Sequence, residues 1–330
     1  MHLLLVSGGT GGHIAPALSV LDRALERGLD ADLILGGLKV KMGINRAKYI
    51  YNAAELKPQN TLRILGGIVR TFGDVWRSRV ILAFGGYPVF PPLVSAVLLR
   101  KDFYLFEGDA MPGKANRFFE PFSREVLCAF RNSVRFYRRG VFVGIPVRRG
   151  LVPLPKEVAR KRMGIDTDLP VVGILGGSQG SLFLNSLARA LAETGRYYVV
   201  ALVGRRGEPG EGSNYRFIGF QRDMASFYSS LDVIISRAGM SSIGEIAMFR
   251  VPPLFIPYPY ASGHQIHNAL DVVNFGAGEM LLQEEVNREK VEEKVRQLLS
   301  KTRIYRNRLA HYFVPGAADR ILDRVLLSLR

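Results

Sequence analysis

SRAGMSSIGEIAMFRVPPLFIPYPYASGHQIHN, residues 236–268, is the stretch that decides the fold. Its pattern predicts the end of a strand, a short helix over 241–249, a second strand over 254–256 and the start of a further helix. Open α/β sheets bind ligands beyond the C-terminal ends of parallel strands, and helix starts there favour an anion. We therefore expect this stretch to form half of a site for a phosphate-carrying ligand.

The rest of the chain continues the alternation of strands and helices, which is typical of parallel α/β sheets. The strand, Gly-rich turn and helix at 3–25 recur at 171–185, on either side of a basic, proline-containing segment that begins no strand. We expect two Rossmann-like domains with parallel sheets facing a cleft, over 1–150 and 165–315. A linker would cover 151–164, and the last helix, about 316–330, could pack back on the first domain.

Composition narrows the class of partner. The 330 residues carry a net charge of +16, which indicates an anionic partner: nucleic acid, anionic lipid or a phosphorylated substrate.

The single cysteine, Cys128, excludes a disulfide framework. The N-terminus is no signal peptide, so the cytoplasm is the default. The uncharged segment 80–99 contains GGYPVFPP, which one membrane-spanning helix would not tolerate.

Two Gly-rich turns follow strands. GGTGGH at 8–13 lacks the glycine spacing of a dinucleotide-binding fingerprint and the Lys of a P-loop. It is either a tight turn or a ligand-binding loop. In a ligand-binding loop, His13 could act as a general base. In GGSQG at 176–180, Ser178 could cap the next helix or meet a diphosphate.

Glu245 has two interpretations of equal weight. Ser242 and Glu245 fit a capping box, and a carboxylate here could instead accept hydrogen bonds from a ribose. His264 and His267 lack further metal ligands nearby in the sequence, so no metal or other cofactor is expected.

The segment 63–79 has apolar residues at helical spacing among arginines. A buried helix face is the commoner fate of such a stripe, but it also suits the headgroup boundary of an anionic membrane. Nucleic acid is not favoured, because no binding module for it is present. The residues of this expected membrane surface are Ile64, Leu65, Ile68, Arg70, Phe72, Trp76 and Arg77.

Several motifs together resemble the MurG family of bacterial N-acetylglucosaminyltransferases, which make lipid II from lipid I. They are GGTGGHIAPAL, FGGY, GIPVR, GGSQG, SRAGMSSIGEIA and the HQ at 264–265. The resemblance implies a GT-B fold and inverting transfer of GlcNAc from UDP-GlcNAc to the 4-hydroxyl of undecaprenyl-pyrophosphoryl-MurNAc-pentapeptide, for peptidoglycan synthesis and hence cell shape and division. It also implies a peripheral protein on the cytoplasmic face of the plasma membrane.

The resemblance also assigns site residues. Glu245 corresponds to the ribose-binding acid, Gln265 to a sugar contact, and Arg148 and Ser178 to diphosphate contacts. His13 is the favoured base, with Glu107 as a second candidate. Donor contacts would come from Thr10, Gly11, Gly12, Asp109, Asn116, Arg148, Ser178, Gln179, Gln221, Met240, Ser241, Glu245, His264 and Gln265. Acceptor contacts would come from Gly12, His13, Gly85, Gly86 and Tyr87.

One segment departs from the family. Phe106-Glu107-Gly108-Asp109 stands where the family usually has His-Glu-Gln-Asn. An ionised Asp109 can accept but not donate a hydrogen bond, which affects sugar recognition. The alternatives are a diacylglycerol glycosyltransferase, a UDP-GlcNAc 2-epimerase, which shares the fold, and a non-catalytic UDP-sugar-binding subunit.

Overall fold

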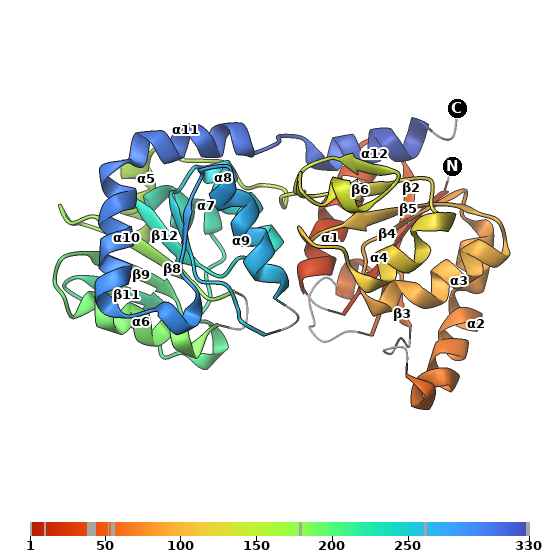
Figure 1. The fold of residues 1–330 in the computed structure, drawn as a ribbon, viewed down its shortest axis with the longest axis horizontal. Coiled ribbons are helices and arrows are strands. Elements are labelled where there is room, and N and C mark those ends of the chain that lie inside the picture. Colours follow the sequence, from red (N-terminus) through yellow and green to blue (C-terminus); the bar gives the residue numbers. More distant parts are fainter. Residues whose placement is uncertain are drawn as a thin grey trace. The chain divides into compact units, whose positions relative to one another are not determined.

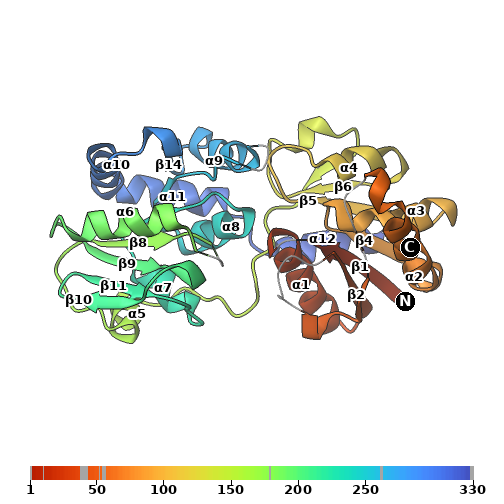
Figure 2. The same cartoon turned by 90° about the horizontal axis from the view of Figure 1, so that it is seen from below.

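A computed structural model describes residues 2–9, 11–37, 44–51, 53, 57–177, 180–260 and 263–327. The chain divides into two compact units (Figures 1 and 2). The first combines Met1–Arg149 with Val314–Arg330, and the second is Gly150–Phe313.

The first unit is built on a parallel sheet of order β3-β2-β1-β4-β5-β6-β7. Its strands are β1 (His2–Gly8), β2 (Asp30–Gly36), β3 (Tyr49–Tyr51), β4 (Val80–Ala83), β5 (Asp102–Glu107), β6 (Val126–Cys128) and β7 (Gly140–Phe142). Its helices are α1 (Gly11–Glu26), α2 (Thr61–Arg77), α3 (Phe90–Leu98), α4 (Lys114–Phe119) and α12 (Ala317–Leu327). The central strands are buried on both faces, as expected for a sheet covered by helices on both sides.

The uncharged segment 80–99 folds as β4, a short 3-10 helix (Tyr87–Val89) and α3. None of the helices in the described ranges combines the length and apolarity that a membrane crossing requires. Cys128 is fully buried in β6, and burial raises the pKa of its thiol to about 12, so it behaves as a core residue.

Helix α12 returns the chain to the first unit. Its apolar face (Ile321, Leu322 and Val325) is buried. Arg23 of α1 donates from Nε to Oδ1 of Asp319 over 2.7 Å, and Arg324 donates from Nε to Glu125 over 2.9 Å.

The second unit is built on a sheet of order β10-β11-β9-β8-β12-β13-β14, parallel except for the pair β10 and β11. Its strands are β8 (Val171–Leu175), β9 (Tyr198–Leu202), β10 (Gly210–Gly212), β11 (Tyr215–Ile218), β12 (Val233–Ser236), β13 (Pro253–Phe255) and β14 (Glu279–Met280). Its helices are α5 (Lys156–Met163), α6 (Leu182–Ala192), α7 (Met224–Ser230), α8 (Met240–Phe249), α9 (His264–Asn274), α10 (Arg288–Ser300) and α11 (Thr302–Tyr312).

The segment expected to be a linker, 151–164, belongs to the second unit and contains α5. Ala159 and Met163 on this helix are buried, and Arg160 donates to the Asp232 carboxylate over 2.8 Å. The helix ends at Gly164, whose φ of 61° suits a left-handed C-cap. These contacts make the segment part of a folded unit.

Candidate active site

His13 lies in the first turn of α1, directly after the Gly-rich loop that follows β1. A methyl group placed on Gly86 would lie 3.2 Å from Nε2 of His13, so the imidazole rests against the glycine loop after β4. Tyr87 anchors that loop by donating from its hydroxyl to the carbonyl of Gly37 over 2.8 Å. The structure thus brings together His13, Gly85, Gly86 and Tyr87, with Gly11 and Gly12 at the start of the same helix. Thr10 lies outside the described residues.

Glu107, at the end of β5, is only 3% exposed. Its carboxylate accepts hydrogen bonds from the Tyr137 hydroxyl (2.5 Å), the backbone N–H of Gly113 (2.8 Å), the backbone N–H of Asp109 (3.0 Å) and the Asn116 side chain (3.0 Å). Burial raises the pKa of Glu107, and the donors oppose that rise. With four donors satisfying it, this carboxylate holds the turn 108–116 in place.

Asn116 is buried beside the same glycine loop. Its amide also donates to the Phe106 carbonyl over 3.0 Å, while its Oδ1 is buried without a partner among the described residues. Asp109, which occupies the position where the family's asparagine is expected, is half-buried.

Glu245 lies inside α8, whose N-cap is Gly239. The capping-box interpretation is therefore wrong, because the helix begins before Ser242 and the glutamate is well past its first turn. The carboxylate of Glu245 is 8% exposed and accepts a 2.8 Å hydrogen bond from the Tyr228 hydroxyl on α7.

The first residues of α8 and α9 include four of the predicted donor contacts. Met240 and Ser241 begin α8, and His264 and Gln265 begin α9. The Oγ of Ser241 and the Nδ1 of His264 are buried and have no hydrogen-bond partner within the described ranges. Neither helix has a side-chain N-cap among the described residues. Both helix starts follow strands β12 and β13 at one edge of the sheet, where an anion is favoured.

Gln265 links the two loops at this edge. Its Oε1 accepts from the backbone N–H of Ala238 (3.2 Å) and of Tyr258 (3.0 Å). Its side-chain oxygen is thus committed to the protein, which leaves its NH₂ group as the part that could donate to a ligand.

Arg237 is a residue that sequence reasoning missed. It is 8% exposed, and burial lowers its pKa. Its guanidinium donates to the carbonyls of Ile256 (2.9 Å) and Pro257 (3.0 Å) and to Gln283 (2.7 Å). The sequence signal that could have identified it is an arginine directly after a buried strand. In the structure, Arg237 holds the loops that precede α8 and α9.

The remaining predicted donor residues lie on separate loops. Gln221 follows β11, and its amide oxygen accepts from Asp223 N–H. Arg148 is exposed after β7 in the first unit. Ser178 and Gln179 lie outside the described residues, but the cap of α6 is Ser181, whose Oγ accepts from Leu184, and not Ser178. The alternative that Ser178 caps this helix is therefore wrong.

Helix α2 points its apolar side outward. The exposed stripe has the i, i+3, i+4 spacing and consists of Leu62 (83% exposed), Leu65 (51%), Val69 (77%), Phe72 (42%) and Trp76 (63%). The buried-face interpretation of this helix is therefore wrong. Ile64 and Ile68 are half-buried beside the stripe, and Arg70 and Arg77 are exposed.

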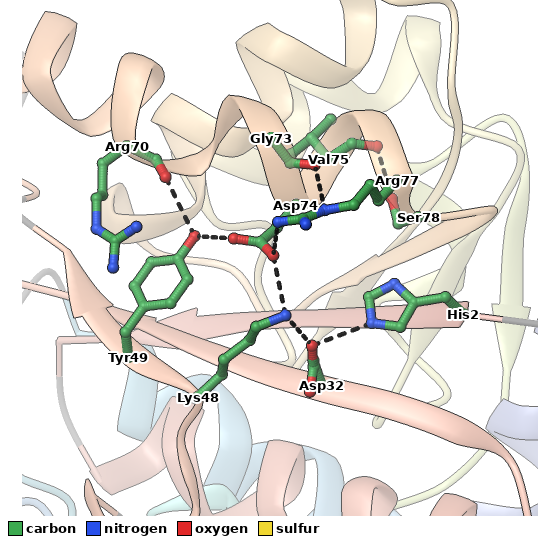
Figure 3. A network of polar contacts seen from close by, with 10 residues as sticks. All are labelled: His2, Asp32, Lys48, Tyr49, Arg70, Gly73, Asp74, Val75, Arg77 and Ser78. Atoms are coloured by element: carbon green, nitrogen blue, oxygen red, sulfur yellow. Dashed lines mark hydrogen bonds and ion pairs between the residues drawn. The ribbon is translucent and has the colours of Figure 1, made fainter.

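The inner face of α2 buries polar Thr71 and Asp74 together with Gly67 and Val75, and Figure 3 shows the network that fixes Asp74. Asp74 accepts from the Tyr49 hydroxyl (2.6 Å) and forms an ion pair with Lys48 (3.0 Å), which also binds Asp32. Burial would raise the pKa of Asp74, but these donors hold it below its ordinary value. Because the polar residues face the sheet, the apolar stripe is left on the surface.

No group of three or more His, Cys, Asp or Glu side chains that could hold a metal occurs in the part of the chain that the structure describes.

Comparison with known proteins gives the family. The N-terminal domain of glycosyltransferase family 28 matches residues 3–128, and the C-terminal domain matches residues 171–321. A protein of Aquifex aeolicus, named UDP-N-acetylglucosamine–N-acetylmuramyl-(pentapeptide) pyrophosphoryl-undecaprenol N-acetylglucosamine transferase, is 33% identical over 97% of this chain and 98% of its own.

Solved structures agree on the fold. MurG of Acinetobacter baumannii has a TM-score of 0.79 at 22% identity, with 99% of each chain covered. A putative UDP-N-acetylglucosamine 2-epimerase of Listeria monocytogenes has a TM-score of 0.69 at 13% identity, covering all of this chain and 96% of its own. The expected GT-B architecture is thus confirmed. The match of both family domains and the identity across almost the whole chain show that this protein is a glycosyltransferase that belongs to the MurG group of glycosyltransferase family 28.

Proposed function

We propose that the protein transfers GlcNAc from UDP-GlcNAc to the 4-hydroxyl of the muramyl sugar of undecaprenyl-pyrophosphoryl-MurNAc-pentapeptide, with inversion at the anomeric carbon. The observation that carries this proposal is the 33% identity, over nearly the full length of both chains, to a relative named for this reaction. The product would be lipid II, the disaccharide-linked precursor of peptidoglycan.

The donor would lie against the starts of α8 and α9. Two helix starts that have no side-chain cap among the described residues offer N–H groups and positive dipole ends to a diphosphate. The buried Oγ of Ser241 and Nδ1 of His264 offer further polar contacts. The carboxylate of Glu245 would accept hydrogen bonds from the ribose hydroxyls. The NH₂ group of Gln265 would contact the sugar, since its oxygen is already engaged.

Other contacts to the donor follow the family resemblance. Arg148 would meet the diphosphate, as would Ser178 and Gln179 in the second Gly-rich turn, and the backbone near Gln221 would meet the uracil. Positive groups of this kind stabilise the charge that develops on the leaving diphosphate without a metal ion.

His13 would act as the base. In the transfer, the acceptor O4–H proton passes to the imidazole, a bond forms between O4 and the anomeric carbon, and the bond from that carbon to the UDP oxygen breaks as UDP takes the electron pair. The packing of the imidazole against Gly86 would fix the ring beside the acceptor loop of Gly85, Gly86 and Tyr87. Glu107 is disfavoured as the base, because four donors already occupy its buried carboxylate.

The protein would bind the cytoplasmic face of the plasma membrane as a peripheral protein. Its acceptor carries a lipid tail, and the exposed apolar stripe of α2 lies among exposed arginines. An apolar helix face flanked by cations suits an anionic membrane surface.

Radiolabelled UDP-GlcNAc with a short-chain lipid I analogue tests the reaction. We expect a labelled disaccharide lipid, and its formation should fall by two or more orders of magnitude in His13→Ala, because a general base contributes about 10²–10⁴-fold. Transfer to diacylglycerol instead of the lipid I analogue would refute the acceptor assignment. Conversion of UDP-GlcNAc to its 2-epimer would refute the reaction class. If His13→Ala kept turnover within a few-fold of wild type, the base assignment would be wrong.

A further inference from the structure

The second unit contains a pocket at the edge of its sheet away from the proposed donor loops. The pocket has a volume of about 400 Å³. Leu231 and Val251 line the pocket and precede the N-terminal ends of β12 and β13. The proposed donor loops, at Arg237 and Ile256, follow the C-terminal ends of the same strands. Strands β12 and β13 run parallel, so the pocket and the proposed donor site lie at opposite edges of one sheet.

The floor of the pocket is apolar. Tyr228, Leu231 and Val251 are each at most 2% exposed. Phe249 packs on Tyr228 with ring centroids 5.2 Å apart, and Pro153 and Ala310 complete the walls. The volume falls in the range of small-molecule sites, roughly 300–1,000 Å³, whose linings are mostly apolar with a few polar groups.

The rim carries three cations, Lys156, Arg250 and Arg306. Lys156 forms an ion pair with Asp232, which also pairs with Arg160. Arg250 and Arg306 are exposed, and their guanidinium groups have no hydrogen-bond or ion-pair partner among the described residues. Two uncompensated guanidinium groups beside an apolar floor favour a ligand that supplies a negative charge.

The backbone at Arg250 strengthens this inference. Arg250 ends α8 in the left-handed conformation, with φ 54° and ψ 37°. A C-cap of this kind favours glycine, so the backbone disfavours an arginine here, and no contact of its guanidinium with the described residues compensates. Arg100 is the other described non-glycine residue with positive φ.

We propose that this pocket is a second ligand site that binds an amphipathic anion: a small aliphatic or aromatic group that bears one phosphate or carboxylate. The apolar group would lie on Tyr228, Leu231 and Val251, and the anionic group would bind Arg250 and Arg306. This site opens at the other edge of the sheet from the nucleotide-sugar loops, although the Tyr228 hydroxyl donates to Glu245. The proposal does not depend on the proposed reaction.

Hexyl phosphate is a suitable probe, and its binding to the full-length protein can be measured by isothermal titration calorimetry. We expect saturable binding that weakens as salt is raised. Arg250→Gly should weaken it at least fivefold. Glycine suits the left-handed backbone, so this variant should melt at or above the wild-type temperature, and a loss of binding will not reflect unfolding.

Arg100→Gly is the matched control, because it makes the same change at a residue of nearly equal φ (51° against 54°) in the first unit. It should bind hexyl phosphate within twofold of wild type. Ala310→Phe, which fills the pocket without removing a charge, should also abolish binding. Equal affinity in Arg250→Gly and Arg100→Gly, or wild-type affinity in Ala310→Phe, would place the ligand elsewhere and overturn the proposal.

Two further probes test the class of ligand. Inorganic phosphate has the charge without the apolar group, and 1-hexanol has the apolar group without the charge. Both should bind at least tenfold more weakly than hexyl phosphate. Inorganic phosphate as tight as hexyl phosphate would mean a simple anion site, and hexanol as tight would mean that the arginines contribute nothing; either result overturns recognition of an amphipathic anion.

Discussion

Replacing Phe72 and Trp76 together by serine should detach the protein from anionic membranes while leaving its fold intact. These side chains are 42% and 63% exposed on the outer stripe of α2. Aromatic side chains of this size cover roughly 150–250 Å², so the pair presents about 200 Å² of apolar surface to water. Removing all of it from water would contribute about 5 kcal/mol at roughly 25 cal/mol per Å².

A helix lying in the membrane interface buries only one side of such rings, so we expect about half of that value. A loss of about 2.5 kcal/mol corresponds to about sixtyfold weaker partitioning. The melting temperature should change little, because exposed side chains away from special features contribute within about ±0.5 kcal/mol to stability.

Flotation with liposomes of phosphatidylglycerol and phosphatidylcholine measures the partitioning. The matched control replaces Leu182 and Phe220 of the second unit by serine, since these are also strongly exposed (63% and 79%). It should float like wild type. Wild-type flotation of the Phe72→Ser, Trp76→Ser protein, or equal loss in the control, would show that α2 is not the membrane contact.

Three further predictions follow from buried or paired carboxylates. Glu245→Ala should raise the KM for UDP-GlcNAc at least tenfold, because hydrogen bonds to a charged group contribute about 1.5–3 kcal/mol. Tyr228→Phe keeps the carboxylate and should change the KM less. Equal KM values for wild type and Glu245→Ala would contradict the proposed contact between Glu245 and the ribose. Glu107→Gln should lower the free energy of unfolding, measured by calorimetry, by about 1–3 kcal/mol, because the amide NH₂ would face hydrogen-bond donors. Unchanged stability together with a large loss of kcat would instead favour a catalytic role for Glu107. Burial would raise the pKa of Asp319, but hydrogen bonds from Arg23 and Arg27 hold it below the ordinary value of 3.8, so its contribution to stability is present above that pH and lost as pH falls through the lower folded value. Asp319→Asn should melt below wild type at pH 7, and the gap in melting temperature should narrow as the pH falls below 3.8.

Much of the fold could be predicted from the sequence because buried parallel strands are apolar runs. β12 ends at Ser236, where the sequence predicts the end of a strand. The strands β3, β10 and β14 were missed, since they stand at the edges of the two sheets and are not fully buried; β10 is the exposed Gly-Glu-Gly. Such strands are fixed by their neighbours in the sheet and carry no periodic signal of their own.

The place of a residue in the fold was predictable where it follows a strand and begins a helix, as with His13 and Gln265, whose roles stay predictions. It was not predictable where the decisive partner is distant in the sequence. The bond between Tyr228 and Glu245 joins two helices, and no local pattern could choose it over a capping box. Arg237 was missed for the same reason, because its acceptors lie about twenty residues further along the chain.

The return of α12 to the first unit has a consequence for biosynthesis. During translation, the first 149 residues emerge without the helix that covers α1 and that pairs with Glu125 through Arg324. The second unit, by contrast, is a continuous segment and can complete its core as soon as Phe313 has left the ribosome. Domains usually finish folding in the order of their synthesis. Here the second unit lies in the sequence between the two parts of the first, so the nascent protein should complete folding of its second unit before its first. A ribosome stalled just before Val314 should therefore carry a folded second unit and an incompletely folded first unit.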